Sequence, residues 1–487
     1  MTEARTPSPE FPRVTLFFTV FLDLAGFGMI LPLLPFYAQR YGADAFQVGL
    51  LFSVYSLSQA IGAPFLGRIS DRFGRRPILL ITVAGHGLSL VLFALAGNFT
   101  VLLVARIAAG IFAANFSIAQ AYVADVTPPE TRAKGMGLVG AALGMGFVVG
   151  PGLGGLLSFF GQVAVPLGAA VLAAVNFAMI FQALPESLKG TARRRPARWN
   201  PIRGLREIGA PTGTLLVVFF LIIVAFSAME GTLALFCEAV FGFGVAETSV
   251  LLVMIGIVIA IVQGGLLGRL VERFGERGLV RVGIALMALG LLGVPLSAGG
   301  EGHTPTRESG STGGEIRDLG REPSSPVLDG SPEPEDGMPP SRDVRLSAGA
   351  GAEPPASPGL AEDPREERSG SDPLRLGVVA LLLLGLASIL LAVGNGVCNP
   401  SLLGLISRLT EAERQGQTLG LTRSLGALAR TVGPLWGGWV FREMGPSWPY
   451  YLASILMLGT LALAAFFLRR LPLEHRVPAS SPSSEAG

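Results

Sequence analysis

Two ionisable side chains stand deep inside apolar stretches of the sequence, where a charge is unfavourable unless it has a partner or a function. Asp23 lies within the apolar run 13–37, and Arg106 lies within the run 99–124. If the first run is a helix that crosses a bilayer, Asp23 is ~15 Å along it, near the middle of the membrane. An ionisable group at this depth costs at least ~2.5 kcal/mol, so it is kept where it faces a cavity or a partner. A carboxyl in such a place can take up and release a proton as its surroundings change.

We therefore predict that Asp23 binds a coupled proton and that Arg106, which reaches a comparable depth from the other side, tunes or relays it. Two alternatives stay open for Asp23: a hydrogen bond that packs or gates helices, and direct contact with a cationic substrate. Further polar side chains inside apolar runs are candidates for substrate contact in the same cavity. They are Asn115, Gln120, Glu230, Gln263, Asn395 and Arg430.

The apolar runs that carry these groups are long enough to be transmembrane helices. Hydrophobic residues make up 50% of the chain and charged residues only 15%, whereas a soluble domain carries about 25% charged residues. Each run is sufficient to cross a hydrocarbon core of ~30 Å. The runs lie near 13–37, 46–66, 77–97, 99–124, 136–158, 164–184, 212–236, 246–269, 279–298, 374–398, 417–441 and 448–468. The sequence therefore predicts an all-α polytopic membrane protein with twelve transmembrane helices.

A repeated decapeptide indicates that the chain is a duplication. Gly67 to Arg76 reads GRISDRFGRR, and Gly268 to Arg277 reads GRLVERFGER, an offset of 201 positions from 67 to 268. Each copy ends one apolar run and begins the next, as a short loop between two membrane-spanning helices would. Because an echo of this length and register is improbable by chance, we predict two pseudo-symmetric bundles of six helices.

The segments between the runs complete the domain organisation. A second echo, GPGLGG from Gly150 and GPLWGG from Gly433, has an offset of 283 positions from 150 to 433. The change in offset, about 82 positions, matches an insertion in the second bundle. This insertion contains no lysine or aromatic residue and is predicted to be disordered, because it cannot bury enough apolar surface to offset the entropy of ordering. The predicted segments are a tail (1–12), the first bundle (13–184), a basic linker (185–211), three spans (212–298), the insertion (299–373), three spans (374–468) and a second tail (469–487).

The distribution of lysine and arginine among short loops predicts the orientation in the membrane. Basic residues gather in the loops after the even-numbered spans and in the linker, whereas the opposite loops hold little beyond Arg40 and Arg442. Positive charge marks the cytosolic side. We therefore predict a multi-pass protein of the plasma (inner) membrane with both termini cytosolic and the insertion 299–373 on the opposite face.

Several of these motifs resemble the major facilitator superfamily. The resemblance rests on GRISDRFGRR after the second span, ARIAAG in the fourth and GMGFVVGPGLGG in the fifth, and it covers the chain except 299–373. FLDLAGFGMILPLLP in the first span and SDRFGRRPILL are similar to the drug/proton antiporters of the tetracycline-efflux group. The pattern Gly146-x-x-x-Gly150-Pro151-x-x-Gly154-Gly155 fits the motif associated with antiporters in that superfamily.

The resemblance implies a cytosolic gate. Arg75 or Arg76 would bridge Asp125, and Asp71 would face the positive N-terminal end of the eleventh span. These contacts would close the cytosolic side and favour the outward-open state, although a cluster that only sets topology is the alternative. The residues that the resemblance assigns to this gate are Gly67, Asp71, Arg72, Gly74, Arg75, Arg76, Asp125 and Arg132.

The resemblance also implies that spans five and eight meet between the halves. Gly146, Gly150 and Gly154 recur every four residues and leave one helix face bare, which lets a neighbouring helix approach closely. Span eight offers a small face at Gly256, Ala260, Gly264 and Gly268. We predict that the two faces form a dry seam that limits leakage, with plain helix packing in lipid as the alternative.

The function that the resemblance implies is secondary active transport, namely proton-coupled efflux (antiport) of small amphipathic or hydrophobic compounds by alternating access. An importer or uniporter of a small metabolite with the same fold stays an alternative, as does a non-transporting membrane sensor that uses the 299–373 arm. Ser89 stands where the tetracycline exporters carry an acid, which argues against tetracycline itself.

Other classes of protein lack support in the sequence. There is no G-x-x-x-x-G-K-[ST], H-E-x-x-H or G-x-S-x-G motif, so we expect no enzyme activity. A net charge of +2 gives no basic footprint for nucleic acid. Cys237 and Cys398 have no metal-ligand spacing, and we expect neither a metal nor a cofactor. The expected partners are a small-molecule substrate, protons and the lipid bilayer, with the protein acting as a monomer.

Overall fold

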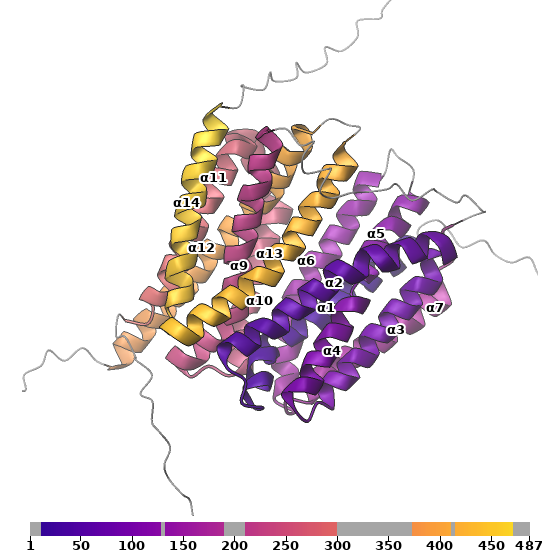
Figure 1. Cartoon of the computed structure of the whole chain (residues 1–487), viewed down its shortest axis with the longest axis horizontal. Helices are drawn as coiled ribbons and strands as arrows, with labels where there is room; N and C mark the ends of the chain where they lie inside the picture. Colours follow the sequence, from indigo (N-terminus) through magenta and orange to yellow (C-terminus); the bar gives the residue numbers. More distant parts are fainter. Residues whose placement is uncertain (1–10, 128–131, 189–209, 300–372, 411–413, 471–487) are drawn as a thin grey trace, which may run out of the picture. The chain divides into compact units, whose positions relative to one another are not determined.

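The computed structural model describes residues 11–127, 132–188, 210–299, 373–410 and 414–470, and every regular element in these ranges is a helix. The first half of the chain (Figure 1) contains α1 (Phe11–Gln39), α2 (Ala45–Phe73), α3 (Arg75–Ala94), α4 (Phe99–Phe112), α5 (Asn115–Val126), α6 (Arg132–Ser158) and α7 (Ala164–Ala183). The second half contains α9 (Ala210–Phe241), α10 (Val245–Ile261), the π-helix η2 (Val262–Leu266), α11 (Leu267–Leu296), α12 (Pro373–Arg408), α13 (Gln415–Met444) and α14 (Trp448–Arg470). Most of the two predicted tails, of the linker 185–211 and of the insertion 299–373 lies outside the described residues.

These helices supply the twelve predicted spans. Within the described ranges, ten stretches are long and apolar enough to cross a membrane, and one of them, Val245–Leu296, has 52 residues. That stretch holds two spans, because the backbone turns inside α11 at Gly275, where φ is 68°. The remaining span is α13, which has 30 residues and is less apolar than the others because it carries arginines such as Arg423 and Arg430. The predicted fold class is therefore confirmed.

Two spans differ from their predicted form. The run 99–124 is a broken helix, because α4 ends at Phe112 and α5 begins at Asn115 after a short turn. The run 374–398 continues past Pro400 as far as Arg408. A proline removes one backbone hydrogen bond, but neighbouring helices in a bundle tolerate that loss.

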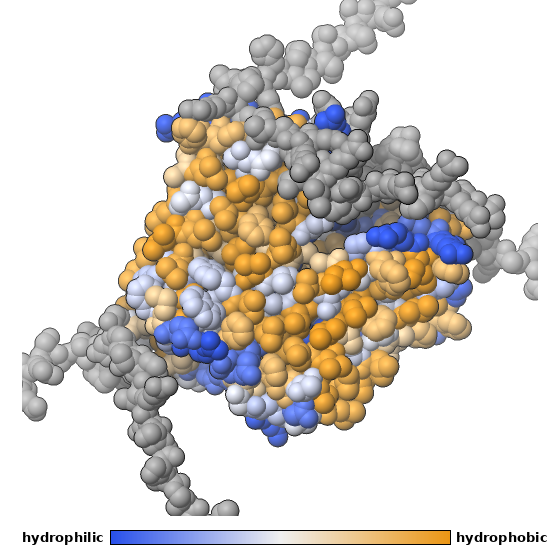
Figure 2. Space-filling view, viewed as in Figure 1, coloured by the Kyte–Doolittle hydropathy of each residue, from blue (hydrophilic) through white to orange (hydrophobic). Residues whose placement is uncertain are grey.

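The outer surface of the helices is largely apolar. In Figure 2, hydrophobic side chains cover most of the visible helical surface, and hydrophilic ones gather near the ends of helices. Large apolar side chains such as Leu88, Val250 and Leu382 are about 70% exposed, at 70%, 70% and 68%. A surface of this kind is suited to lipid and not to water. The chain is thus a multi-pass membrane protein.

Helices of the two halves approach each other closely at the end of the bundle that carries the α1–α2 loop, here named the closed end. A Cβ atom at Gly49 of α2 would overlap the carbonyl oxygen of Pro434 of α13, and one at Gly438 would overlap the backbone of Ala45. Only glycine permits this approach. At the same end, the Arg442 guanidinium lies 3.3 Å from the Asp44 carboxylate, and these two groups join the halves.

The other end of the bundle, which carries the α2–α3 loop and is here named the open end, lacks this close approach in the part of the chain that the structure describes. Gly144 of α6, Gly264 of η2 and Gly268 of α11 lie toward this end, and a Cβ at any of them would meet no neighbouring described atom within 4 Å. Among the described residues here, a hydrogen bond crosses between the halves from Arg423 Nη2 to Gln120 Oε1 at 2.6 Å. The predicted orientation makes the open end cytosolic.

Candidate functional site

Asp23 lies midway along α1 and is held by an amide from the broken fourth span. Its carboxylate accepts a hydrogen bond from Nδ2 of Asn115, the first residue of α5. The Asn115 side chain is only 2% exposed, whereas Asp23 is half-buried. The break between α4 and α5 lies directly before Asn115, so this amide stands at the start of a helix. The structure thus brings together two of the predicted site residues.

His86 of α3 is a neighbour of Asp23 that the sequence did not assign to the site. It lies within electrostatic range of Asp23 and is 5% exposed. Both of its ring nitrogens are buried without a hydrogen-bond partner among the described residues. A lone histidine in an apolar span carries no signal of proximity to an acid on another span, so only the fold shows this arrangement.

Arg106 does not contact Asp23 in the structure. Its guanidinium, on α4, lies over the ring of Tyr55 on α2, with 4.5 Å between Cζ and the ring centroid. Arg106 is 2% exposed, and such a contact stabilises a cation that is removed from water. Tyr55 lies within electrostatic range of both Arg106 and Asp23. The two predicted proton-coupling residues therefore share a neighbour and make no ion pair within the described part of the chain.

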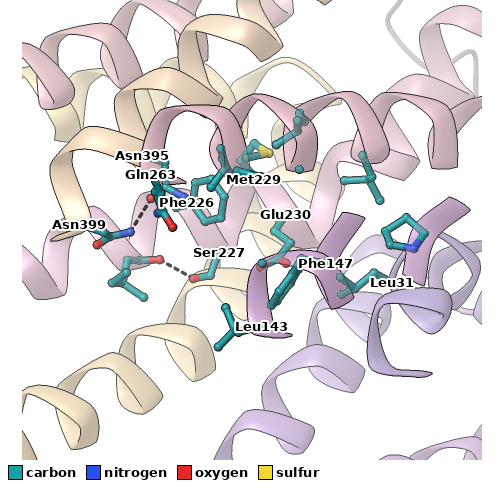
Figure 3. A pocket seen from close by; sticks show the side chains of 18 of the residues that line it. Leu31, Leu143, Phe147, Phe226, Ser227, Met229, Glu230, Gln263, Asn395 and Asn399 are labelled. Atoms are coloured by element: carbon teal, nitrogen blue, oxygen red, sulfur yellow. Dashed lines mark hydrogen bonds between the residues drawn. The ribbon is translucent and has the colours of Figure 1, made fainter. Parts of the chain in front are cut away.

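A cavity of about 370 Å³ lies between the halves. Its polar lining comes from the second half only: Ser227, Glu230, Gln263, Asn395, Asn399 and Arg430. The remaining lining is mainly apolar and includes Leu31, Leu143, Phe147, Phe226 and Met229, which are labelled in Figure 3. Four predicted cavity residues, Glu230, Gln263, Asn395 and Arg430, are therefore gathered here. Two others are not, since Asn115 binds Asp23 and Gln120 binds Arg423.

Local helix geometry positions the amide side chains of this cavity. Gln263 lies in η2, a π-helical turn between α10 and α11. Such turns are uncommon and recur at functional sites. Asn395 and Asn399 are one helical turn apart on α12, and Nδ2 of Asn399 donates to Oδ1 of Asn395. Figure 3 shows Gln263, Asn395 and Asn399 grouped together, with Glu230 beside Phe147.

The predicted gate residues of the first half are connected around Arg75. Its side chain lies 3.1 Å from Asp125 and 2.6 Å from Asp71, and it donates to Ser70 Oγ at 2.7 Å. The expected bridge to Asp125 is thus present, made by Arg75 and not by Arg76. Asp71 was expected to face the start of α13, but within the described residues its one partner is Arg75.

The other predicted gate residues surround this cluster. Gly74 has φ of 108°, a conformation that favours glycine, so the turn between α2 and α3 requires it. Arg72 lies over the Phe73 ring, Arg76 donates to the Phe181 carbonyl, and Gly67 has open space around it. Arg132 begins α6, but its side chain lies outside what the structure describes.

Glu186 is a member of this cluster that sequence reasoning missed. Its carboxylate accepts from the backbone N–H groups of Arg75 and Arg76, at 2.9 and 3.1 Å. These are the first residues of α3, so Glu186 caps a positive helix terminus from the segment that follows α7. The two segments are 110 residues apart, and no local pattern relates them.

The second half contains the same joint with its charges inverted. Under the two repeat offsets, Arg75 corresponds to Glu276 and Asp125 corresponds to Arg408. Arg408 Nη2 lies 3.2 Å from Glu276 Oε1, as Arg75 lies 3.1 Å from Asp125. In the first half the pair joins the residue after Gly74 to the end of span four. In the second half it joins the residue after Gly275 to the end of span ten. The repeat register, carried through to these positions, would have revealed the pair from sequence.

A charge swap tests whether this second pair is a working joint. Glu276→Arg places two cations together and should lower thermal stability by on the order of 1 kcal/mol, and adding Arg408→Glu should restore most of the loss. In the first half, Arg75→Asp with Asp125→Arg should not recover, because Asp71 would then face a second acid one helical turn away. Melting curves of purified variants measure both cycles, and additive losses in the second half would contradict the pairing.

The predicted glycine seam between spans five and eight is wrong in its details. A Cβ at Gly146, Gly150 or Gly154 would collide with α1, at distances of 2.6, 2.6 and 2.7 Å from Leu24, Ala25 and Met29. This glycine face therefore packs inside the first half, next to Pro151, whose ring approaches Gly28 of α1.

The seam between the halves uses the adjoining face of α6. Gly155 approaches Ser249, Gly152 approaches Val253, and Gly256 approaches Val148. Gly264 and Gly268 have no neighbour there among the described residues. Spacing identified a small face, and it could not show which of two neighbouring helices covers it.

Comparison with known proteins agrees with this architecture. The sequence matches the family model described as Major Facilitator Superfamily over residues 16–305 and 376–487. It is 36% identical over 278 residues to the tetracycline resistance protein, class C, of Escherichia coli, a match that covers 56% of this chain and 70% of that protein. It is 31% identical over 279 residues to multidrug resistance protein 2 of Bacillus subtilis (strain 168), covering 55% and 69%.

A solved structure shares the fold. The human organic anion transporter MFSD10 superposes with a TM-score of 0.59 at 24% identity, over 94% of this chain and 100% of that one. The two bundles of six helices and the family match over most of the sequence lead to one assignment: the chain belongs to the major facilitator superfamily.

Proposed function

We propose that this transporter is a secondary active exporter that moves small amphipathic or hydrophobic compounds across the membrane in exchange for protons. It works by alternating access, as a monomer in the plasma (inner) membrane with both termini in the cytosol. The observation that carries the proposal is the cavity between the halves, which combines apolar walls with a few polar groups. Such a lining suits a ligand that has an apolar body and a polar end.

The surroundings of Asp23 support a role in proton coupling. Oδ1 of Asn115 accepts from the N–H of Phe116 at 2.8 Å, which orients the amide so that its Nδ2 faces Asp23. This donor stabilises an ionised carboxylate. Asp23 has no ion pair among the described residues, so taking up a proton leaves no buried cation without its partner. The site can therefore hold either protonation state.

Proton and substrate occupy different places in this proposal. Asp23 does not line the cavity. The lining residue that α1 contributes is Leu31, further along the helix. Coupling then acts through movement of the halves and not through competition for one carboxylate. With the predicted orientation, the open end faces the cytosol, where an exporter takes up its cargo.

The relatives support export and leave the cargo open. The names of the two bacterial relatives refer to tetracycline and multidrug resistance. In this chain Ser89, which stands where the resemblance implies an acid, is 3% exposed and donates to the carbonyl of His86 at 2.6 Å. The Ser89 hydroxyl cannot take the place of that carboxylate, and it is already engaged in this hydrogen bond. We therefore propose a cargo other than tetracycline.

Vesicle transport tests the proposal. Inside-out membrane vesicles that contain the protein should accumulate fluorescent amphipaths when their interior is acidified, and a protonophore should abolish the accumulation. Vesicles without the protein are the control. Accumulation that ignores the protonophore would contradict proton coupling, and uptake only into right-side-out vesicles would indicate an importer.

A further inference from the structure

Glu230 and Arg430 are ionisable groups that line the same cavity. Glu230 lies on α9 and Arg430 on α13, and these helices pack side by side. Each side chain lies within electrostatic range of the other, yet the described part of the chain shows no ion pair between them. Glu230 is half-buried and Arg430 is exposed to the cavity. The cavity therefore presents a carboxyl group and a guanidinium group that form no ion pair with each other among the described residues.

The opposite wall of the cavity offers neither of them a counter-charge. Within the described residues, the first half contributes Leu31, Leu143, Phe147 and Pro151, with Gly144, to the lining. The amide groups of Gln263, Asn395 and Asn399 can form hydrogen bonds but carry no charge. A carboxylate and a guanidinium removed from bulk water are costly unless each finds a partner of opposite charge. A ligand that carries both a positive and a negative group can pair with both side chains, and each ion pair increases its affinity.

We propose that the cavity selects zwitterionic amphipaths, compounds whose polar end carries a basic and an acidic group beside an apolar body. This inference rests on the proposed function and names its substrate class. The basic group of the ligand pairs with Glu230, and its acidic group pairs with Arg430, whose fork of donors suits a carboxylate. The apolar body lies against Phe147 and Phe226.

The same arrangement discriminates against ligands with a single charge. A cation that pairs with Glu230 brings its charge close to Arg430, and an anion that pairs with Arg430 brings its charge close to Glu230. Juxtaposed like charges lower affinity, which is a common source of specificity. Arg430 therefore disfavours a ligand with only a positive charge, and Glu230 disfavours a ligand with only a negative charge.

A series built on one fluorescent compound tests this directly. Nε-dansyl-lysine is a zwitterion, its methyl ester is a cation, and its Nα-acetyl derivative is an anion, while the dansyl group stays the same. Fluorescence titration of the purified full-length transporter should give a dissociation constant for the zwitterion at least about tenfold lower than for either derivative. The Nα-acetyl methyl ester, which carries neither charge, should bind no better than the derivatives.

Two variants should change the preference in opposite directions. Glu230→Gln should bind the zwitterion and the anion equally, and Arg430→Gln should bind the zwitterion and the cation equally. Because each variant is expected to keep one good ligand, general misfolding cannot imitate the result. Glu238→Gln on α9 and Arg423→Gln on α13 change the same residue types outside the cavity lining, and they should leave the order of affinities unchanged.

Other outcomes overturn the inference. If the methyl ester binds as tightly as the zwitterion and depends on Glu230 alone, the cavity selects cations, and proton-driven export still stands. If the uncharged derivative binds best, the two charges take no part in recognition. If neither substitution changes any affinity, the cavity is not the binding site. By contrast, loss of protonophore sensitivity in the vesicle assay would refute the proposed function whatever the charge preference.

Discussion

Asp23→Asn should abolish proton-driven transport and leave passive exchange of substrate across the membrane intact. The amide imitates a protonated carboxyl that never releases its proton, so the two halves can still move while the coupling is lost. A pH difference of about 2 units supports a substrate gradient of about 100-fold for each exchanged proton, since each pH unit corresponds to about 1.4 kcal/mol. In the variant this gradient should fall to about one. Reconstituted vesicles with an imposed pH difference measure it directly.

Counterflow separates lost coupling from a damaged protein. Vesicles preloaded with unlabelled substrate should still take up labelled substrate through the Asp23→Asn variant at equal pH. Asp44→Asn, which changes an acid at the closed end where Asp44 caps α2 and faces Arg442, should retain the driven gradient. An undiminished gradient in Asp23→Asn would remove Asp23 from the coupling mechanism and leave the packing role in its place.

The sequence could predict the helices and their hinges because both depend on local signals. Apolar runs of membrane length determine the spans, and the repeated decapeptide locates the turns at Gly74 and Gly275. Both glycines adopt a positive φ, 108° and 68°, which other residues rarely tolerate. The Arg75–Asp125 contact followed from the resemblance, and the corresponding Glu276–Arg408 contact follows from the same repeat once its register is carried through.

Contacts between distant segments could not be predicted in the same way. The face made by Gly150 and its neighbours is evident from spacing, but whether α1 or α10 covers it depends on how all the helices pack. Glu186 reaches the start of α3 from the end of the bundle, and His86 approaches Asp23 from a different span. None of these contacts has a local pattern. The cavity lies between these two cases. The sequence identified several of its polar residues as candidates, but it could not show that they line one cavity.

Gly49→Ala should shift the transporter away from the conformation that is closed at the α1–α2 end. A Cβ at this position would overlap the carbonyl oxygen of Pro434 on the other half, so the halves could no longer meet there. Overpacking of this kind typically costs about 1–3 kcal/mol, which corresponds to a change of about 5- to 150-fold in the ratio of two conformations. Spin labels at Leu95 and Ala239, exposed residues near this end of the two halves, should report a longer distance.

Comparison with a second glycine shows why this effect is conformational and not general damage. Gly150 is also crowded, since a Cβ there would lie 2.6 Å from the carbonyl oxygen of Ala25 on α1, but this neighbour belongs to the same half. Gly150→Ala should therefore lower the melting temperature and leave the label distance unchanged, because a contact inside one rigid body is the same in every conformation. Gly459→Ala, in open surroundings on α14, should alter neither. A longer label distance in Gly150→Ala, or an unchanged label distance in Gly49→Ala, would contradict this interpretation. It would show that Gly49 does not mark a contact between the halves that is distinct from the contact of Gly150 within one half.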